Sequence, residues 1–217
     1  MQDKQLLKKD LFGEVWMMTS GDEAFVLRDT RPAKWWLAWL ARRLLRREAR
    51  ALAALAGIDG VPQLLASGAQ QLKRSFVAGV PMYEGRPRDP KYFRAANRLL
   101  RRLHRAGVVH NDLAKEPNLL VRADGMPAFI DFQLAWHAPR RNRFFRMAAR
   151  EDIRHLLKHK RNYRPDLLTE RERTILASPS PLSRAWMSIA KPIYLLVTRQ
   201  ILGWSDREGA SDRGRRK

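Results

Sequence analysis

The chain has no cysteine, half as many acidic as basic residues, and no long uninterrupted apolar run. Without cysteine it can form neither disulfide bonds nor zinc–thiolate sites, and its five histidines alone favour no metal cage. The first residues, Met1–Lys4, lack the apolar core of a signal peptide. These absences together lead us to expect a reducing, cytoplasmic setting.

The shortage of acids leaves a large positive charge. Forty-three Lys and Arg against 22 Asp and Glu give a formal net charge of +21 and a pI near 11.3. This balance favours anionic partners such as phosphorylated glycans, an acidic membrane face or nucleic acid. Nucleic acid is the weakest of these, because the sequence has no helix-turn-helix, zinc finger or aromatic RNA-binding strand motif.

The most apolar stretch, residues 182–204, is interrupted by Arg184, Lys191, Pro192 and Arg199. A membrane-spanning helix needs about 20 residues with few charges. We therefore predict that this stretch does not cross a membrane.

Tryptophans gather beside basic residues at two places in the chain. Residues 34–39 read Lys-Trp-Trp-Leu-Ala-Trp and lead into an arginine run, and Trp186, Tyr194 and Trp204 lie near the other end. Aromatic rings and positive charge are typical of peripheral attachment to an anionic leaflet, where each basic side chain contributes about 1 kcal/mol. We expect contact with the cytoplasmic face of the inner membrane. The alternative is that the tryptophans are core and the arginines are merely solvated.

Three polar residues, Asp112, Asn118 and Asp131, follow one another beside short apolar segments. Strands at residues 118–121 and 128–130, joined by an Ala-Asp-Gly turn, predict a β-hairpin with a polar loop at each end. Phosphoryl transfer needs one carboxylate to orient the attacking hydroxyl, and a carboxylate and an amide to hold magnesium against the phosphates. A structural hairpin with incidental acids is the alternative.

This segment, His-Asn-Asp at 110–112 with Asn118 and Asp131-Phe132 downstream, resembles the catalytic core of the protein-kinase-like superfamily. The chain departs from protein kinases in three respects. Asn118 lies six residues after Asp112 instead of five, Gln133 replaces the glycine of Asp-Phe-Gly, and no Ala-Pro-Glu follows. The abbreviated pattern is similar to compact bacterial lipopolysaccharide core (Kdo and heptose) kinases, aminoglycoside phosphotransferases and RIO-type kinases.

The resemblance implies ATP and Mg²⁺ as cofactors and a role for each polar residue of the loop. Asp112 would be the catalytic base, Asn118 and Asp131 would hold Mg²⁺, and Lys115 would contact the transferred phosphate. His110 would brace the loop without transferring a proton.

The nucleotide-binding residues of the family are less complete in this chain. Residues 11–18 resemble the end of a glycine-rich phosphate loop of which only Gly13 remains, and a plain strand turn is the alternative. Residues 24–28 predict a strand that places Arg28 where protein kinases carry the phosphate-binding lysine. Arginine keeps the charge and can bind phosphate through two parallel hydrogen bonds. Lys34 is the substitute if the alignment slips.

A helix is predicted over residues 35–56, and its apolar face includes Glu48. A buried carboxylate without a partner costs several kcal/mol, so Glu48 should have a cation beside it. Arg28, twenty residues earlier, matches the separation of the lysine–glutamate pair in kinases. The alternative is a surface glutamate paired with Arg47 or Arg50.

We therefore predict a two-lobed α+β fold of the protein-kinase type. A small mixed lobe would cover residues 1–79, a mainly helical lobe without a full activation segment residues 80–204, and a basic, disordered tail residues 205–217. A helix near residues 92–104, a hinge at 78–81 and a helix carrying Asp152 behind the catalytic loop complete the expected plan.

The predicted function is an ATP- and Mg²⁺-dependent phosphotransferase acting on a hydroxyl. Its expected acceptor is a membrane glycolipid, the lipopolysaccharide core. A serine/threonine protein acceptor is the first alternative, and a non-catalytic kinase-like module that binds anionic membrane or RNA is the second. The sequence indicates no oligomeric state.

Overall fold

The computed structural model describes residues 3–21 and 23–178. One compact unit extends to Leu176 and a second begins at Ala177, so the first unit is described below. The expectations for residues 182–204 and for the tail at 205–217 lie outside the described residues. None of the helices within residues 3–178 is long and apolar enough to cross a membrane.

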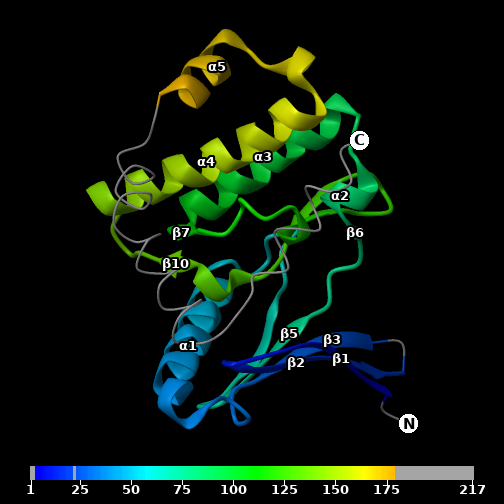
Figure 1. Ribbon diagram of the computed structural model, residues 1–217, viewed down its shortest axis with the longest axis vertical. Coiled ribbons are helices and arrows are strands. Elements are labelled where there is room, and N and C mark those ends of the chain that lie inside the picture. Colours follow the sequence, from blue (N-terminus) through cyan, green and yellow to red (C-terminus); the bar gives the residue numbers. More distant parts are fainter. Residues whose placement is uncertain (1–2, 22, 179–217) are drawn as a thin grey trace, which may run out of the picture. The chain divides into compact units, whose positions relative to one another are not determined.

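The N-terminal part is a five-stranded antiparallel sheet in the order β1-β2-β3-β5-β4, with one long helix, α1, against it (Figure 1). The strands are β1 (Asp3–Asp10), β2 (Gly13–Ser20), β3 (Glu23–Asp29), β4 (Leu64–Ser67) and β5 (Gln71–Ser75). A short 3₁₀ helix, η1 (Trp35–Leu37), leads into α1 (Ala38–Ala54).

Helix α1 forms because apolar residues recur at helical spacing and pack on the sheet through β4 and β5. Its buried residues are Ala41, Leu44, Leu45, Glu48, Ala51 and Leu52. The sheet contributes Val26 and Leu72 to the same side, which are 7% and 0% exposed. The predicted apolar face of this helix, with Glu48 in it, is therefore confirmed.

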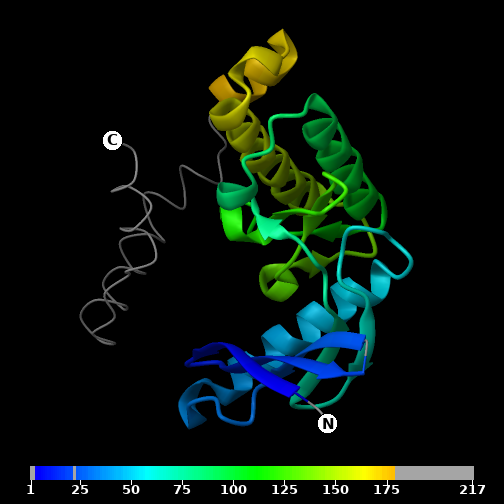
Figure 2. The same cartoon turned by 90° about the vertical axis from the view of Figure 1, so that its right-hand side faces the viewer.

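The C-terminal part is mainly helical, and α3 and α4 lie side by side in both views (Figures 1 and 2). The helices are α2 (Met82–Gly85), α3 (Pro90–Arg105), α4 (Arg143–Tyr163) and α5 (Glu170–Ala177), with 3₁₀ helices η2 (Glu116–Asn118), η3 (Phe132–Leu134) and η4 (Pro165–Leu167). Two small antiparallel sheets pair β6 (Val80–Pro81), β8 (Leu119–Val121) and β9 (Pro127–Phe129) in the order β6-β8-β9, and β10 (Trp136–His137) with β7 (Val108–Val109).

The main hydrophobic core joins the two parts. Leu45, Leu52 and Leu72 of the N-terminal part belong to the same buried cluster as Leu103 of α3 and Phe132 after β9. Because this cluster is continuous, the hairpin β8–β9 is fixed against helices from both parts of the chain.

The hairpin, the strand at 24–28, the helix near 92–104 and the helix carrying Asp152 were predicted and are present. Strand β1 was not predicted. The predicted lobe boundary at residue 79 falls between the end of β5 and the start of β6, and the division into lobes at that residue stays a prediction. Only residues 132–142 separate Asp131 from α4, which leaves little room for an activation segment.

Candidate active site

The loop between β7 and β8 is held from behind by Asp152 of α4. The Asp152 carboxylate accepts hydrogen bonds from the backbone N–H of His110 (2.8 Å) and of Asn111 (2.9 Å). A third contact, at 3.2 Å, joins it to Nε2 of His104. Asp152 is fully buried, so these contacts satisfy a carboxylate that would otherwise be costly to bury. The predicted brace behind the loop is confirmed.

His110 links the loop to the end of β9. Its Nδ1 lies 3.3 Å from the backbone N–H of Asp112 and accepts from it, so its Nε2 carries the proton and donates to the carbonyl of Ile130 at 2.9 Å. The ring packs edge-on to Phe129 and tilted against Phe132. Both ring nitrogens are thus engaged with the backbone, which fits the predicted structural role of His110.

Asp112 and Asn118 are joined directly. The side-chain amide of Asn118 donates from Nδ2 to the backbone carbonyl of Asp112 and to its Oδ2, both at 2.9 Å. Lys115 Nζ lies 3.2 Å from the same Oδ2. The extra residue in this loop does not separate the three side chains, and all three meet at one carboxylate.

The hairpin brings Asn118 and Asp131 to the same end. Leu119 pairs with Phe129 in the β8–β9 register, and the N–H of Ile130 then donates to the carbonyl of Asn118 at 3.0 Å. Asp131 follows at once in the left-handed region, with φ at 62° and the N–H of Gln133 3.4 Å from its Oδ1. The two predicted magnesium ligands therefore leave adjacent strand ends.

The carboxyl of Asp131 is ionised at neutral pH. Burial alone would raise the pKa of Asp131, but positive groups around it outweigh burial and hold the pKa below its ordinary value. In order of effect, the positive side chains of the N-terminal sheet are Arg74, Lys8 and Arg28. A cationic side of the N-terminal sheet thus faces this acid.

The predicted ion pair between Arg28 and Glu48 is present and buried. Arg28 Nη1 lies 2.7 Å from Glu48 Oε2, and the side chains are 6% and 1% exposed. A second guanidinium, that of Arg74, has Nη1 3.0 Å from the other carboxylate oxygen, Oε1. Two arginines on β3 and β5 therefore share one buried glutamate on α1.

Sequence reasoning missed Arg74 and Lys8. Arg74 pairs with Val26 in the β3–β5 register and Arg28 pairs with Leu72, so the two arginines lie on the same face of the sheet. Alternation along β5 could have indicated this face. Lys8 lies on β1, a strand with no apolar alternation to predict it.

Gly13 begins β2 in a backbone conformation that suits glycine, with φ at 128°. A Cβ atom at this position would lie 2.1 Å from the backbone oxygen of Asp29 on the paired strand β3. The close approach of β2 to β3 is enough to require glycine. The role of Gly13 beside a nucleotide phosphate remains a prediction.

Helix α4 holds the far side of the loop through two further contacts. His159 Nε2 donates to the carbonyl of Leu113 at 2.8 Å, and the hydroxyl of Tyr163 donates to Glu116 Oε2 at 2.6 Å. Burial lowers the pKa of His159, so its ring is neutral at pH 7. These contacts fix both halves of the loop in which the extra residue lies.

Helix α1 and the catalytic loop meet at a single backbone oxygen. The carbonyl of Leu134 accepts from Nη2 of Arg47 at 3.2 Å and from Nδ2 of Asn111 at 3.0 Å. Asn111 has φ at 64°, a conformation that asparagine tolerates better than most residues.

A family model for the RIO domain matches residues 9–173, about three quarters of the chain, and includes every predicted site residue. The chain belongs to the RIO-domain family. This family is protein-kinase-like, and the antiparallel sheet followed by a helical part agrees with it. The predicted α+β, kinase-like fold and the resemblance to RIO-type kinases are thereby confirmed. A comparison with curated proteins finds no match.

Membership in the RIO-domain family implies kinase-like phosphotransferase chemistry in general, with ATP and Mg²⁺. Within residues 3–21 and 23–178, no cluster of three or more His, Asp or Glu could hold a metal by itself. A two-ligand site suits Mg²⁺, which in kinase-type sites takes one or two side chains together with phosphate oxygens and waters. Asn118 fits this use, because its amide nitrogen makes the hydrogen bonds to Asp112 and its oxygen takes no part in them.

Proposed function

We propose that the chain is an ATP- and Mg²⁺-dependent kinase that transfers the γ-phosphate to a hydroxyl of a membrane glycolipid, a sugar of the lipopolysaccharide core. The observation that carries the proposal is the arrangement of Asp112, Asn118 and Asp131. The Asn118 amide is hydrogen-bonded to the Asp112 carboxylate, and the ionised Asp131 leaves the strand end next to Asn118. The buried Asp152 also fixes the backbone of the loop that carries Asp112. A hairpin with incidental acids would not require this.

Asp112 would orient the acceptor hydroxyl and take its proton. Its Oδ2 is held by Asn118 and Lys115, so Oδ1 is the oxygen that would face the acceptor. This positioning contributes to catalysis because it fixes the attacking oxygen before reaction. Lys115, whose side chain is 60% exposed, would contact the transferred phosphate.

Asn118 Oδ1 and the Asp131 carboxylate would hold Mg²⁺, which neutralises charge on the phosphates when it is bound. Arg28, oriented by Glu48, would contact the nucleotide phosphates, and Lys8 on β1 would add positive charge beside them. Both side chains help to lower the pKa of Asp131, which supports a place for the phosphates beside the cationic side of the sheet.

The glycolipid acceptor is supported by the charge and by the exposed aromatics. A net charge of +21 favours an anionic acceptor, and phosphorylated core sugars are anionic. Three tryptophans exposed near the start of α1 favour an enzyme that works at a lipid surface.

The first experiment measures Mg²⁺-dependent ATP binding and slow ATP turnover for the full chain and for Asp112→Asn and Asp131→Asn. We expect Asp112→Asn to lose turnover by at least a hundredfold while it keeps nucleotide binding, because general-base catalysis contributes about 10²–10⁴-fold. Asp131→Asn should weaken Mg²⁺-dependent binding as well. Asp59→Asn, an exposed acid on another loop, is the control and should leave both unchanged.

The acceptor is tested by supplying labelled ATP with deacylated core oligosaccharide, intact glycolipid or a mixture of proteins. Label on the core sugar that disappears in Asp112→Asn would support the proposal. Label found only on serine or threonine of a protein would show that the acceptor is a protein and not a glycolipid. Absence of ATP binding at millimolar nucleotide would contradict the kinase and favour a non-catalytic module.

A further inference from the structure

Three tryptophans near the start of α1 are exposed, although tryptophan is usually well buried. Trp35, Trp36 and Trp39 are 87%, 43% and 64% exposed. We call these three residues the tryptophan surface. The alternative that these tryptophans form part of the core is wrong for these three. Exposed apolar groups of this size, gathered within five residues, are typical of an interaction site.

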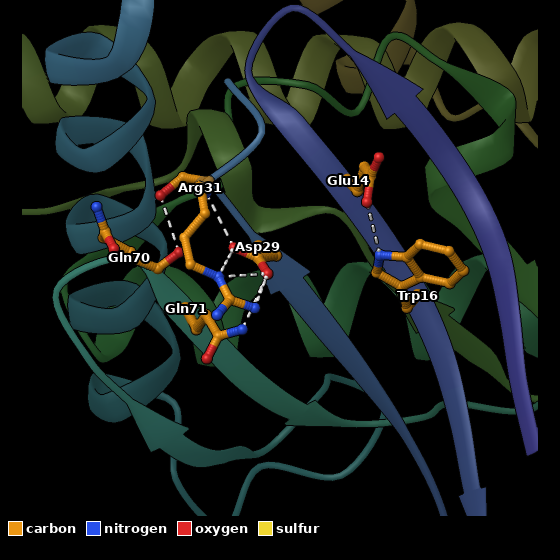
Figure 3. Close-up of polar contacts among 7 residues, drawn as sticks. Glu14, Trp16, Asp29, Arg31, Gln70 and Gln71 are labelled. Carbon is orange, nitrogen blue, oxygen red and sulfur yellow. Dashed lines mark hydrogen bonds and ion pairs between the residues drawn. The ribbon is translucent and has the colours of Figure 1, made fainter. Parts of the chain in front are cut away.

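The segment that presents the tryptophan surface is anchored by polar contacts on the sheet (Figure 3). The Asp29 carboxylate receives hydrogen bonds from Arg31 (2.5–3.0 Å) and from the Gln71 amide at 2.9 Å. The hydroxyl and the N–H of Thr30 both donate to the carbonyl of Gln70 at 2.8 Å.

A further contact fixes the residue next to the tryptophans, since the N–H of Lys34 donates to the carbonyl of Leu11 at 3.1 Å. Burial would raise the pKa of Asp29, but hydrogen bonds from Arg31 and Gln71 outweigh it and keep the pKa below its ordinary value. The anchor is therefore ionised at neutral pH. The tryptophans project from a fixed base.

Arginines continue the tryptophan surface along α1. At 100° per residue, Trp39 shares an arc of about 100° with the exposed arginines of the helix, opposite its buried face. We call these arginines the basic face. They are Arg42, Arg43, Arg46 and Arg50.

The charge of this region has one sign. Residues 30–47 contain no acid, and the nearest acids on either side, Asp29 and Glu48, are buried and engaged in ion pairs. The basic residues in this range are Arg31, Lys34, Arg42, Arg43, Arg46 and Arg47. A negative surface that meets this region would find no opposing exposed carboxylate from the segment itself.

We propose that the tryptophan surface and the basic face dock the chain onto an anionic lipid bilayer. Indole rings prefer the headgroup level of a bilayer, and arginines beside them would contact lipid phosphates. Single-stranded nucleic acid fits less well, because it is bound in basic grooves lined by stacking aromatics, whereas the three tryptophans here lie within five residues at the start of one helix. The proposal stands without kinase activity, because docking needs no turnover.

Sedimentation with lipid vesicles tests this docking. The full chain is mixed with vesicles of phosphatidylcholine alone or of phosphatidylcholine with phosphatidylglycerol, at low and high salt. We expect binding to the anionic vesicles that salt weakens. Replacing Trp35, Trp36 and Trp39 together by Ser should lower the partition coefficient at least tenfold. Circular dichroism checks that this variant folds.

A second variant changes only charge and keeps all the tryptophans. Arg42, Arg43 and Arg46 are replaced together by Gln, and a similar loss of at least tenfold is expected on anionic vesicles. Its matched control changes three exposed arginines of α3 in the same way and should alter partition less than twofold. These control residues are Arg94, Arg98 and Arg101.

Three results would overturn the proposal. The first is unchanged vesicle binding in the tryptophan variant, which would assign binding to another surface. The second is an equal loss in the α3 control, which would mean that net charge alone matters. The third is binding to single-stranded RNA, but not to vesicles, that the tryptophan variant abolishes.

Discussion

Glu48 is the buried acid that pairs with both Arg28 and Arg74. The Glu48→Gln variant should therefore have a lower free energy of unfolding. The ionised Asp131 lies near the same two guanidinium groups. With glutamine at 48, both guanidinium groups remain, at 6% and 12% side-chain exposure, with one carboxylate near them. Removing one partner of a buried ion pair costs about 3–5 kcal/mol.

That loss should be seen in the urea midpoint and in thermal unfolding. For a chain of this size, each 1 kcal/mol shifts Tm by about 2–4 °C, so Glu48→Gln should lower Tm by roughly 6–20 °C. Adding Arg74→Met to Glu48→Gln should recover part of the loss, because it removes one of the unpaired charges. Glu84→Gln, at an exposed position of α2, is the control. A loss below about 1 kcal/mol for Glu48→Gln would refute the reasoning and would mean that water reaches the arginines.

Three further changes follow from the site. Asp152→Ala should destabilise the chain by about 2–6 kcal/mol in urea unfolding, because the backbone N–H groups of His110 and Asn111 lose their acceptor, and an unchanged midpoint would exclude the brace. Gly13→Ala should lower Tm even without nucleotide, since its Cβ would strike the β3 backbone; loss of ATP binding at unchanged Tm would instead favour a nucleotide role. Burial lowers the pKa of His155 and of His159, so the unfolded chain binds more protons there. The free energy of unfolding should therefore reach its full value above about pH 6.5 and decrease as the pH falls below it. The double variant with Gln at positions 155 and 159 should lose this pH dependence.

The catalytic loop and its hairpin could be predicted because their chemistry is local. Asp112, Asn118 and Asp131 stand at fixed spacings beside apolar strands, and a hairpin with that register brings its two ends together. The partner of Glu48 was predicted for a different reason. A carboxylate on the apolar face of a helix needs a cation, and Arg28 lay at the separation that kinases use.

The parts that were missed depend on contacts between distant segments. Strand β1 is mostly charged and exposed, and pairing with β2, not its own pattern, makes it a strand. Lys8 could not be placed near Asp131 without it. Alternation along β5 puts Arg74 on the same side as Leu72, but only the pairing of β5 with β3 brings it beside Arg28.

The shared hydrogen bonds at Leu134 make the junction between α1 and the catalytic loop independent of the side chain at position 134. Arg47 and Asn111 both reach the carbonyl, which every amino acid possesses, so substitution of Leu134 by another residue would leave the junction intact. Variation of the amino acid at position 134 therefore does not indicate how much the carbonyl of that residue contributes to the junction. An amide-to-ester replacement between residues 134 and 135, which weakens that carbonyl as an acceptor, would loosen the junction from both sides at once.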